Sequence, residues 1–267
     1  MNRGVAMRYQ IQRLSFGGIF DQSFRLMRDH FGPLTLGFMI LYVPYNVAIS
    51  FLQSANPMDI SFGRIAAILV AALAMMIFAP LFQLTATSAI ADAYQSQPTD
   101  FKTAFAHGRK LYAPYLGTAF LMFLFLIPLM LALVVPAIIF MVYWMLIGPI
   151  AVVEQVYGRK ALGRSRALVR GYWWRTVGVT FVAGLASGVL AMGLQSLFAF
   201  IPLVGAVASG LVQAVSATYM AALLVVLYVD LRCRHEDFDL QVLAREVAGG
   251  SGAARAVAPV SGDAAAV

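Results

Sequence analysis

The chain has 267 residues, of which 61% are hydrophobic and only 12% charged, and its formal net charge is +7. Soluble domains carry about 25% charged residues, so this composition, with a mean hydropathy of +0.81, excludes an ordinary soluble protein and indicates a membrane protein. In such a chain the positive charge is typical of lysines and arginines that fix orientation, and it does not indicate a nucleic-acid partner.

Neither end of the chain contains an apolar stretch long enough to cross a membrane. Residues 1–13 predict a short cytoplasmic segment, and no apolar core precedes a cleavage site, so a secretory signal peptide is not expected. Residues 235–247 predict a short amphipathic segment, and the Gly/Ala/Val-rich residues 248–267 predict a disordered tail. A single cysteine, Cys233, excludes an internal disulfide and a thiolate metal cluster.

Four long stretches between these ends contain no charged side chain: 31–58, 65–91, 111–153 and 176–229. Because about 20 helical residues cross a bilayer, the first two stretches predict one span each and the last two predict two each. Pro136 divides the third stretch, and Pro202 with Gly205 divides the fourth. The prediction is an all-α polytopic protein with a six-span membrane domain over 14–234. Its spans are expected near 34–53, 65–92, 113–134, 137–154, 176–198 and 205–230.

The basic residues predict how these spans are oriented. Every lysine and arginine except Arg64 falls on the same side of the six predicted spans. The positive-inside rule places that side, and with it both termini, in the cytoplasm. We therefore expect a multi-pass protein of the bacterial cytoplasmic membrane.

Short matches within the sequence indicate a threefold repeat. A shift of 81 residues superposes 20–34 on 101–115. A further shift of 61 residues aligns 161–175 with this second segment. Each copy predicts a cytoplasmic-side amphipathic interfacial helix followed by a transmembrane hairpin. Small residues further predict close packing between the fifth and sixth spans; they are Gly184, Gly188, Ala206, Gly210 and Ala214.

The third copy, ALGRSRALVRGYWWR at 161–175, places apolar residues on one side of a helix and arginines on the other. At mid-bilayer each arginine costs roughly 2.5–3.5 kcal/mol, whereas near anionic lipid each gains about 1 kcal/mol. We therefore expect a surface helix whose apolar stripe faces the acyl chains. It acts either as a plain interfacial anchor or as a site for a phospholipid headgroup. The candidate headgroup contacts are Arg28, Arg109, Arg164, Arg166, Arg170, Trp173 and Trp174.

Three acidic residues, Asp92, Glu154 and Asp230, each close the second span of a predicted hairpin. Ionisable groups at the edge of a membrane are functional candidates, and two interpretations stay open. The acids form ion pairs that fix each surface helix to its hairpin, or they form a proton or cation relay.

The sequence contains none of the motifs that would predict an enzyme. It lacks a nucleotide-binding Gly-rich loop, a His-Glu-x-x-His pair and a Gly-x-Ser-x-Gly elbow. The three histidines, His30, His107 and His235, are far apart along the chain. We expect no catalytic residues, no metal site and no cofactor.

Three segments, 14–34, 161–175 and 227–240, resemble a bacterial family of six-span membrane domains. Members of this family are fused to glycerophosphodiester phosphodiesterases or occur as free-standing inner-membrane proteins. The resemblance is carried by the Gly-x-Trp-Trp-Arg and Asp-Leu-Arg-x-Arg patterns and implies an inner-membrane protein. It does not imply the phosphodiesterase activity, which belongs to a catalytic domain outside these segments.

Two functions compete at this point. The leading hypothesis is a non-enzymatic scaffold or accessory module that contacts membrane lipids, including anionic phospholipids, and an unidentified protein partner. The alternative is a transporter or carrier for a lipid or small amphiphile, which would need a polar cavity within the membrane. Its candidate lining residues are Gln83, Thr87, Gln213 and Thr218. An intramembrane hydrolase ranks third, because the sequence offers no nucleophile and base pair.

Overall fold

The computed structural model describes residues 11–54, 61–94, 100–198 and 201–237, and these residues form nine α-helices. The helices are α1 (Phe16–Asp29), α2 (Phe31–Ser54), α3 (Phe62–Tyr94), α4 (Phe101–Ala132), α5 (Val134–Tyr143), α6 (Ile147–Val153), α7 (Gly158–Val169), α8 (Trp173–Leu197) and α9 (Pro202–Glu236). Most of the amphipathic segment predicted at 235–247, all of the tail at 248–267 and residues 1–10 lie outside the described residues.

Six segments are long and apolar enough to cross a membrane: Phe31–Leu52, Phe62–Tyr94, Phe101–Leu131, Val134–Val153, Trp173–Leu194 and Leu203–Glu236. The prediction of an all-α chain with six such segments is thereby confirmed, and they indicate a multi-pass membrane protein. The predicted helix 137–154 is not continuous, because the chain turns at residues 144–146 between α5 and α6. Pro149 falls in the first turn of α6, where a missing backbone N–H costs little.

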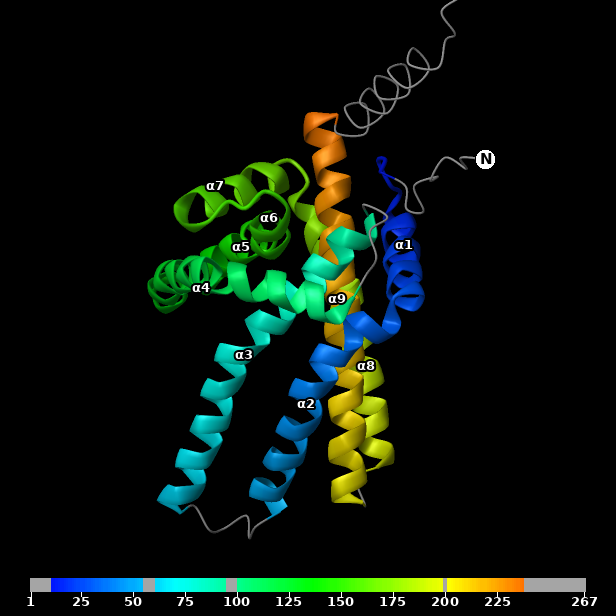
Figure 1. The fold of residues 1–267 in the computed structure, drawn as a ribbon. Coiled ribbons are helices and arrows are strands. Elements are labelled where there is room, and N and C mark those ends of the chain that lie inside the picture. The colour runs from blue at the N-terminus through cyan, green and yellow to red at the C-terminus, as the bar shows by residue number, and fades with distance from the viewer. Residues whose placement is uncertain (1–10, 55–60, 95–99, 199–200, 238–267) are drawn as a thin grey trace, which may run out of the picture.

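Helix α9 lies at the centre of the fold, and α2, α3 and α8 pack along it (Figure 1). The backbones of α2 and α9 approach closely, since a Cβ on Gly210 would lie 2.7 Å from the Val43 Cα. The predicted contact between spans five and six is wrong for Gly184 and Gly188 of α8. Both are exposed, and no atom lies within 4 Å of the position of an added Cβ. Gly210 of α9 instead serves the contact of that helix with α2.

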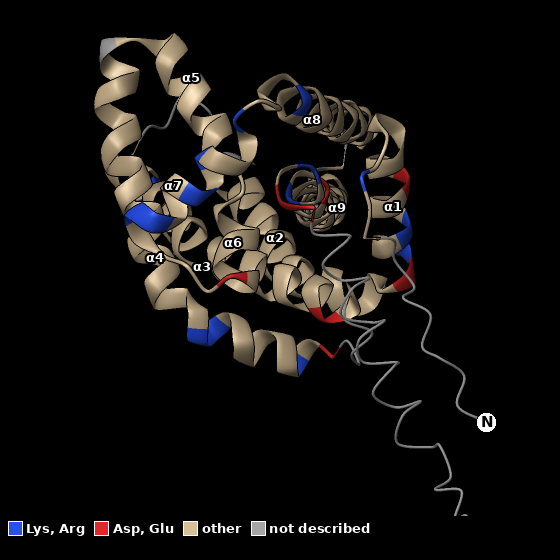
Figure 2. Cartoon of the chain, turned by 90° about the horizontal axis from the view of Figure 1, so that it is seen from above, with Lys and Arg blue, Asp and Glu red and all other residues tan. Residues whose placement is uncertain are grey.

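Helices α4 and α5 form a hairpin that runs across the direction of α9. In Figure 1 this hairpin extends sideways from the upper half of the molecule, and in Figure 2, seen along α9, it lies in the plane of the view. It is joined to α3, where Gly108 lies against Thr85. The Tyr112 hydroxyl donates to the Ile77 carbonyl oxygen of α3, three residues before the helix-distorting Pro80.

The three predicted surface helices differ in the structure, although the sequence repeat predicted three similar units. The first and third copies form the separate helices α1 and α7, whereas residues 101–112 are continuous with the apolar part of α4. The apolar stripes of α1 and α7 are buried against the rest of the protein. Leu26 of α1 and Leu168 of α7, for example, are both buried in the core. The expectation that the α7 stripe faces acyl chains is therefore wrong.

The stretch 161–175 is also not one helix. Helix α7 ends at Val169, and Gly171 adopts a φ of +88°, a left-handed conformation that glycine tolerates better than other residues. Helix α8 then begins at Trp173, so that Arg175 belongs to a different helix from Arg164. This turn directs Arg175 toward the C-terminal part of α9, where it takes part in the first of two ionic networks.

Candidate functional site

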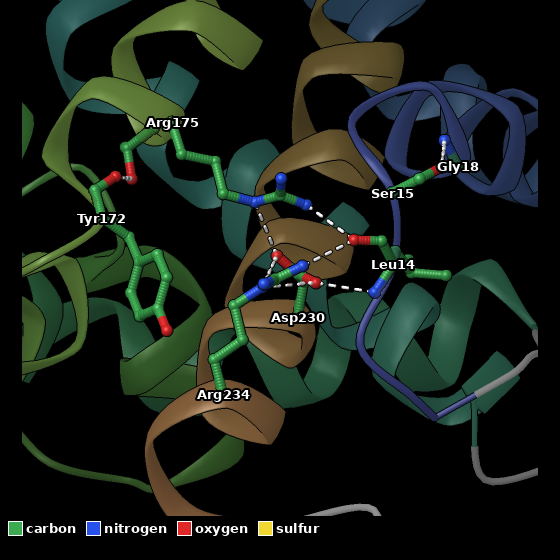
Figure 3. A network of polar contacts seen from close by, with 8 residues as sticks. Leu14, Ser15, Gly18, Tyr172, Arg175, Asp230 and Arg234 are labelled. Carbon is green, nitrogen blue, oxygen red and sulfur yellow. Dashed lines mark hydrogen bonds and ion pairs between the residues drawn. The ribbon is translucent and has the colours of Figure 1, made fainter.

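Asp230, near the C-terminal end of α9, is fully buried and joins three distant parts of the chain (Figure 3). Its carboxylate accepts hydrogen bonds from the Leu14 backbone N–H at 2.8 Å, from Arg175 Nε at 3.0 Å and from Arg234 Nε at 3.0 Å. The same two guanidinium groups donate to the Leu14 carbonyl oxygen at 2.8 and 2.6 Å. The backbone ahead of α1 is thus held between the start of α8 and the end of α9.

Glu154, which follows α6, is the centre of a second network. Its carboxylate accepts two hydrogen bonds from Arg164 of α7, at 2.8 and 2.9 Å, and one from the Tyr228 hydroxyl of α9 at 2.8 Å. Arg164 also pairs with Glu236, which in turn accepts from Arg232 at 2.9 Å. Hydrogen bonds to Glu236 and Glu154 raise the pKa of Arg164. Arg164 therefore fixes α7 to α9 and has little capacity left for a lipid.

Asp92, the third acid, has a different environment. It lies half-buried near the end of α3, and the titratable neighbour that acts on its charge is His107 of α4. Within the part of the chain that the structure describes, no arginine pairs with it. The structure thus supplies ionic partners for two of the three predicted acids, and a relay through all three stays a prediction.

Helix α7 and its C-cap residue carry four exposed cations, Arg159, Lys160, Arg166 and Arg170, which we call the α7 basic surface. Among the residues described here, none of the four forms an ion pair with a carboxylate. The Arg166 guanidinium lies 5.7 Å from the ring centroid of Phe140, a cation–π distance. Seen along α9 from its C-terminal end, lysines and arginines also lie over α1, α4 and α8 (Figure 2).

An exposed aromatic residue lies close to the α7 basic surface in the chain. Trp174 is the second residue of α8 and is 80% exposed, which is unusual for a large aromatic side chain unless it contacts lipid or a partner. Trp173 packs edge-on against it, with 4.7 Å between ring centroids, and donates to the Ile139 carbonyl oxygen at 3.4 Å. Cations and an exposed indole are the chemistry of a membrane-interface site.

The remaining candidate headgroup contacts lie on other helices. Arg28 is exposed at the end of α1 and pairs with its neighbour Asp29 at 3.4 Å. Arg109 is exposed on α4 beside Lys110. The seven residues named from the sequence therefore do not form a single site, because Arg28 and Arg109 are on separate helices and Arg164 is used internally.

Several polar side chains within the spans bond within the protein, whereas the buried hydroxyls of Thr35 and Ser88 have no hydrogen-bond partner among the described residues. Gln213 of α9 donates to Asn46 of α2 at 3.0 Å, a hydrogen bond between two predicted spans. Thr87 and Thr218 are buried and donate to carbonyl oxygens of their own helices at 2.8 Å. An open apolar hollow of about 420 Å³ lies along α9 near its start and is lined by Leu203, Val204, Val207, Ala208 and Leu211.

Sequence reasoning missed the residues that complete the Asp230 network, namely Leu14, Arg175 and Arg234. One signal was available, since Arg234 follows Asp230 by four residues, the spacing of neighbours on a helix. The role of Arg175 depends on the turn at Gly171, and Leu14 contributes only backbone groups. No sequence pattern predicts such a contact.

No group of three or more histidine, cysteine, aspartate or glutamate side chains that could hold a metal ion occurs within the described ranges. The sequence-based resemblance to a six-span bacterial family stays a prediction. No known protein-family model, curated protein or solved structure matches the chain.

Proposed function

We propose that the chain is a non-enzymatic scaffold of the bacterial cytoplasmic membrane that binds anionic phospholipid headgroups at the α7 basic surface. One observation carries the proposal: four exposed cations share α7 and its end without carboxylate partners among the described residues, while Arg164 between them is paired. A cation that folding leaves without a counter-ion is available for a ligand of opposite charge.

Charge and rigidity both favour this assignment. Each exposed lysine or arginine near an anionic leaflet gains about 1 kcal/mol, so four contribute on the order of 4 kcal/mol. The ion pairs of Arg164 to Glu154 and Glu236 hold α7 in place, which reduces the entropy lost when a headgroup binds. Trp174 at the adjacent start of α8 provides a side chain suited to headgroup depth.

The internal bonding of the span residues supports a scaffold over a carrier. Transport would require polar side chains that face a shared cavity within the membrane. Thr87 and Thr218 are instead buried, and each donates to a carbonyl oxygen of its own helix. The close backbone contact of Gly210 with Val43 is likewise typical of solid packing.

The test compares two variants with the same change in net charge. In one, Lys160, Arg166 and Arg170 are replaced by glutamine; in the control, Lys102, Arg109 and Lys110 of α4 are replaced in the same way, and all six are exposed. Each protein is reconstituted in vesicles with phosphatidylcholine and phosphatidylglycerol, one of the two brominated on its acyl chains. Quenching of tryptophan fluorescence measures which lipid surrounds the protein.

We expect the wild-type protein and the α4 control to be quenched more strongly by brominated phosphatidylglycerol than by the brominated zwitterionic lipid. The α7 variant, which keeps Arg159, should lose most of that preference, by up to about 3 kcal/mol for three charges. Equal preference in all three proteins would show that the α7 basic surface does not select anionic lipid. A Trp174→Phe variant identifies how much of the signal comes from that side chain.

A further inference from the structure

The position of the α4–α5 hairpin is fixed by its attachment to α7 and α6. The Ser165 hydroxyl of α7 donates to the Tyr143 carbonyl oxygen at 2.7 Å and accepts from the Leu146 N–H at 3.3 Å. The next residue after α6, Glu154, bonds to Tyr228 of α9. The C-terminal end of α5 therefore lies near the level of Tyr228 along α9.

Helix lengths then limit how far the tip of the hairpin can extend. Leu203, at the start of α9, and Tyr228 are 25 residues apart, about 38 Å at 1.5 Å per residue. Helix α5 has 10 residues and is about 15 Å long, half of a hydrocarbon core of about 30 Å. Even if α5 ran parallel to α9, the tip at Leu133 would stop roughly 20 Å short of the level of Leu203. In the structure it runs across α9 instead (Figures 1 and 2).

The cations of α7 provide an independent constraint. Arg166 lies against the rings of Phe140 and Tyr143 in α5. If the hairpin crossed the membrane, with its tip at the far surface, Phe140 would lie only about 10 Å from that surface. Arg166, which contacts Phe140, would then lie in the hydrocarbon. Arginine is among the costliest side chains at that depth. If α7 is exposed to water, the hairpin packed against it must lie on the same side of the membrane as α7.

The hairpin also has one covered and one uncovered side. Leu162 of α7 and Trp144 are buried in a cluster against Leu121, Leu126 and Phe140, so α7 lies between this side of the hairpin and water. The other side is apolar and exposed: Phe120, Phe123, Leu124, Ile127, Met130 and Leu131. Residues 111–153 contain no charge, and the helical backbone satisfies its own hydrogen bonds, as a lipid environment requires.

We infer that the α4–α5 hairpin does not cross the membrane but lies within the leaflet on the α7 side, with its uncovered side against acyl chains. The occupant is lipid because the face is uncharged and adjoins the cationic α7. Four helices, α2, α3, α8 and α9, then cross the membrane. Four crossings, like six, place both termini on one side. The inference uses the position of α7 outside the hydrocarbon and does not depend on its lipid selectivity.

Single cysteines in a Cys233→Ala background test the inference. Leu133→Cys reports the hairpin tip, Phe62→Cys reports the turn side of α3, and Lys160→Cys reports α7; all three positions are exposed. Intact cells and inverted vesicles are treated with a membrane-impermeant maleimide, and the same proteins are labelled again in detergent. Val135→Cys, which is also exposed, replaces Leu133→Cys if the latter does not fold.

We expect Phe62→Cys to label from outside the cell and Lys160→Cys only in inverted vesicles. Leu133→Cys should resist labelling from outside and react in detergent. Labelling of Leu133→Cys from outside, to the extent seen for Phe62→Cys, would overturn the inference. Labelling of Lys160→Cys from outside would instead contradict the orientation of α7, so the two failures are distinguishable.

A second measurement identifies the occupant of the uncovered side. A bimane label on Leu124→Cys is compared in vesicles with and without phosphatidylcholine that carries a nitroxide on its acyl chain. We expect several-fold quenching of the label, because Leu124 is exposed on the hairpin. A label shielded from the nitroxide lipid would show that a second copy or another protein covers this face, and it would overturn the assignment of acyl chains.

Discussion

Replacing Asp230 by asparagine removes the negative charge at the centre of the first ionic network while keeping the size of the side chain. The two guanidinium groups that it pairs with, on Arg175 and Arg234, have side chains only 18% and 21% exposed, so water replaces the lost partner poorly. The amide also turns one of two acceptor oxygens into a donor that faces a cation. Breaking a buried ion pair by removing one partner costs about 3–5 kcal/mol, and we expect Asp230→Asn to fall in this range.

The cost is measured by reversible unfolding in mixed micelles with increasing sodium dodecyl sulfate, followed by far-UV circular dichroism. Asp21→Asn is the matched control, because Asp21 pairs with Arg25 on the surface of α1, with side chains 70% and 57% exposed. An exposed pair at this helical spacing contributes only about 0.3–0.5 kcal/mol. If Asp230→Asn destabilises the protein no more than Asp21→Asn, the network does not hold the three segments together.

Three further predictions follow from the contacts described above. Gly210→Ala should lower the free energy of unfolding by about 1–3 kcal/mol, because its Cβ meets the α2 backbone, whereas Gly188→Ala, with open space, should be neutral or stabilising by up to about 1 kcal/mol. Glu154→Gln should destabilise by about 1.5–3 kcal/mol in the same unfolding assay, since Arg164 loses one carboxylate but keeps its ion pair with Glu236. Alkaline phosphatase fused after position 57 or 203 should be active, and inactivity at both would reverse the predicted topology.

The number and length of the apolar helices could be predicted from charge-free stretches, but the helix that each one packs against could not. Gly184 and Gly188 have the same four-residue spacing as Ala206 and Gly210, so both pairs predicted a tight contact. In the structure Gly210 touches α2, whereas the α8 pair is exposed. A small residue permits a close approach without specifying the partner, which depends on how the whole chain is arranged.

One ion pair could also be predicted from the sequence, whereas the direction of the α4–α5 hairpin could not. An arginine partner for Glu154 was expected from the arginine-rich helix that follows it, and Arg164 occupies that place. The direction of the α4–α5 hairpin was not predictable in this way. Hydropathy indicates that a segment prefers hydrocarbon to water. It does not indicate whether the segment crosses the membrane or lies within one leaflet.

The bonds from Leu14 to Asp230 also constrain the order of assembly during synthesis. The two residues are separated by 216 positions, so the backbone ahead of α1 reaches its site only after nearly all of the described chain has been made. Contacts between such distant residues carry a large loop-closure cost and form late. Until then, the apolar face of α1, including Ile19 and Leu26, has no α9 to pack against and needs another cover, such as the membrane surface or a chaperone. Formation of the Asp230 network is then a late step in folding, after the helices have been inserted into the membrane.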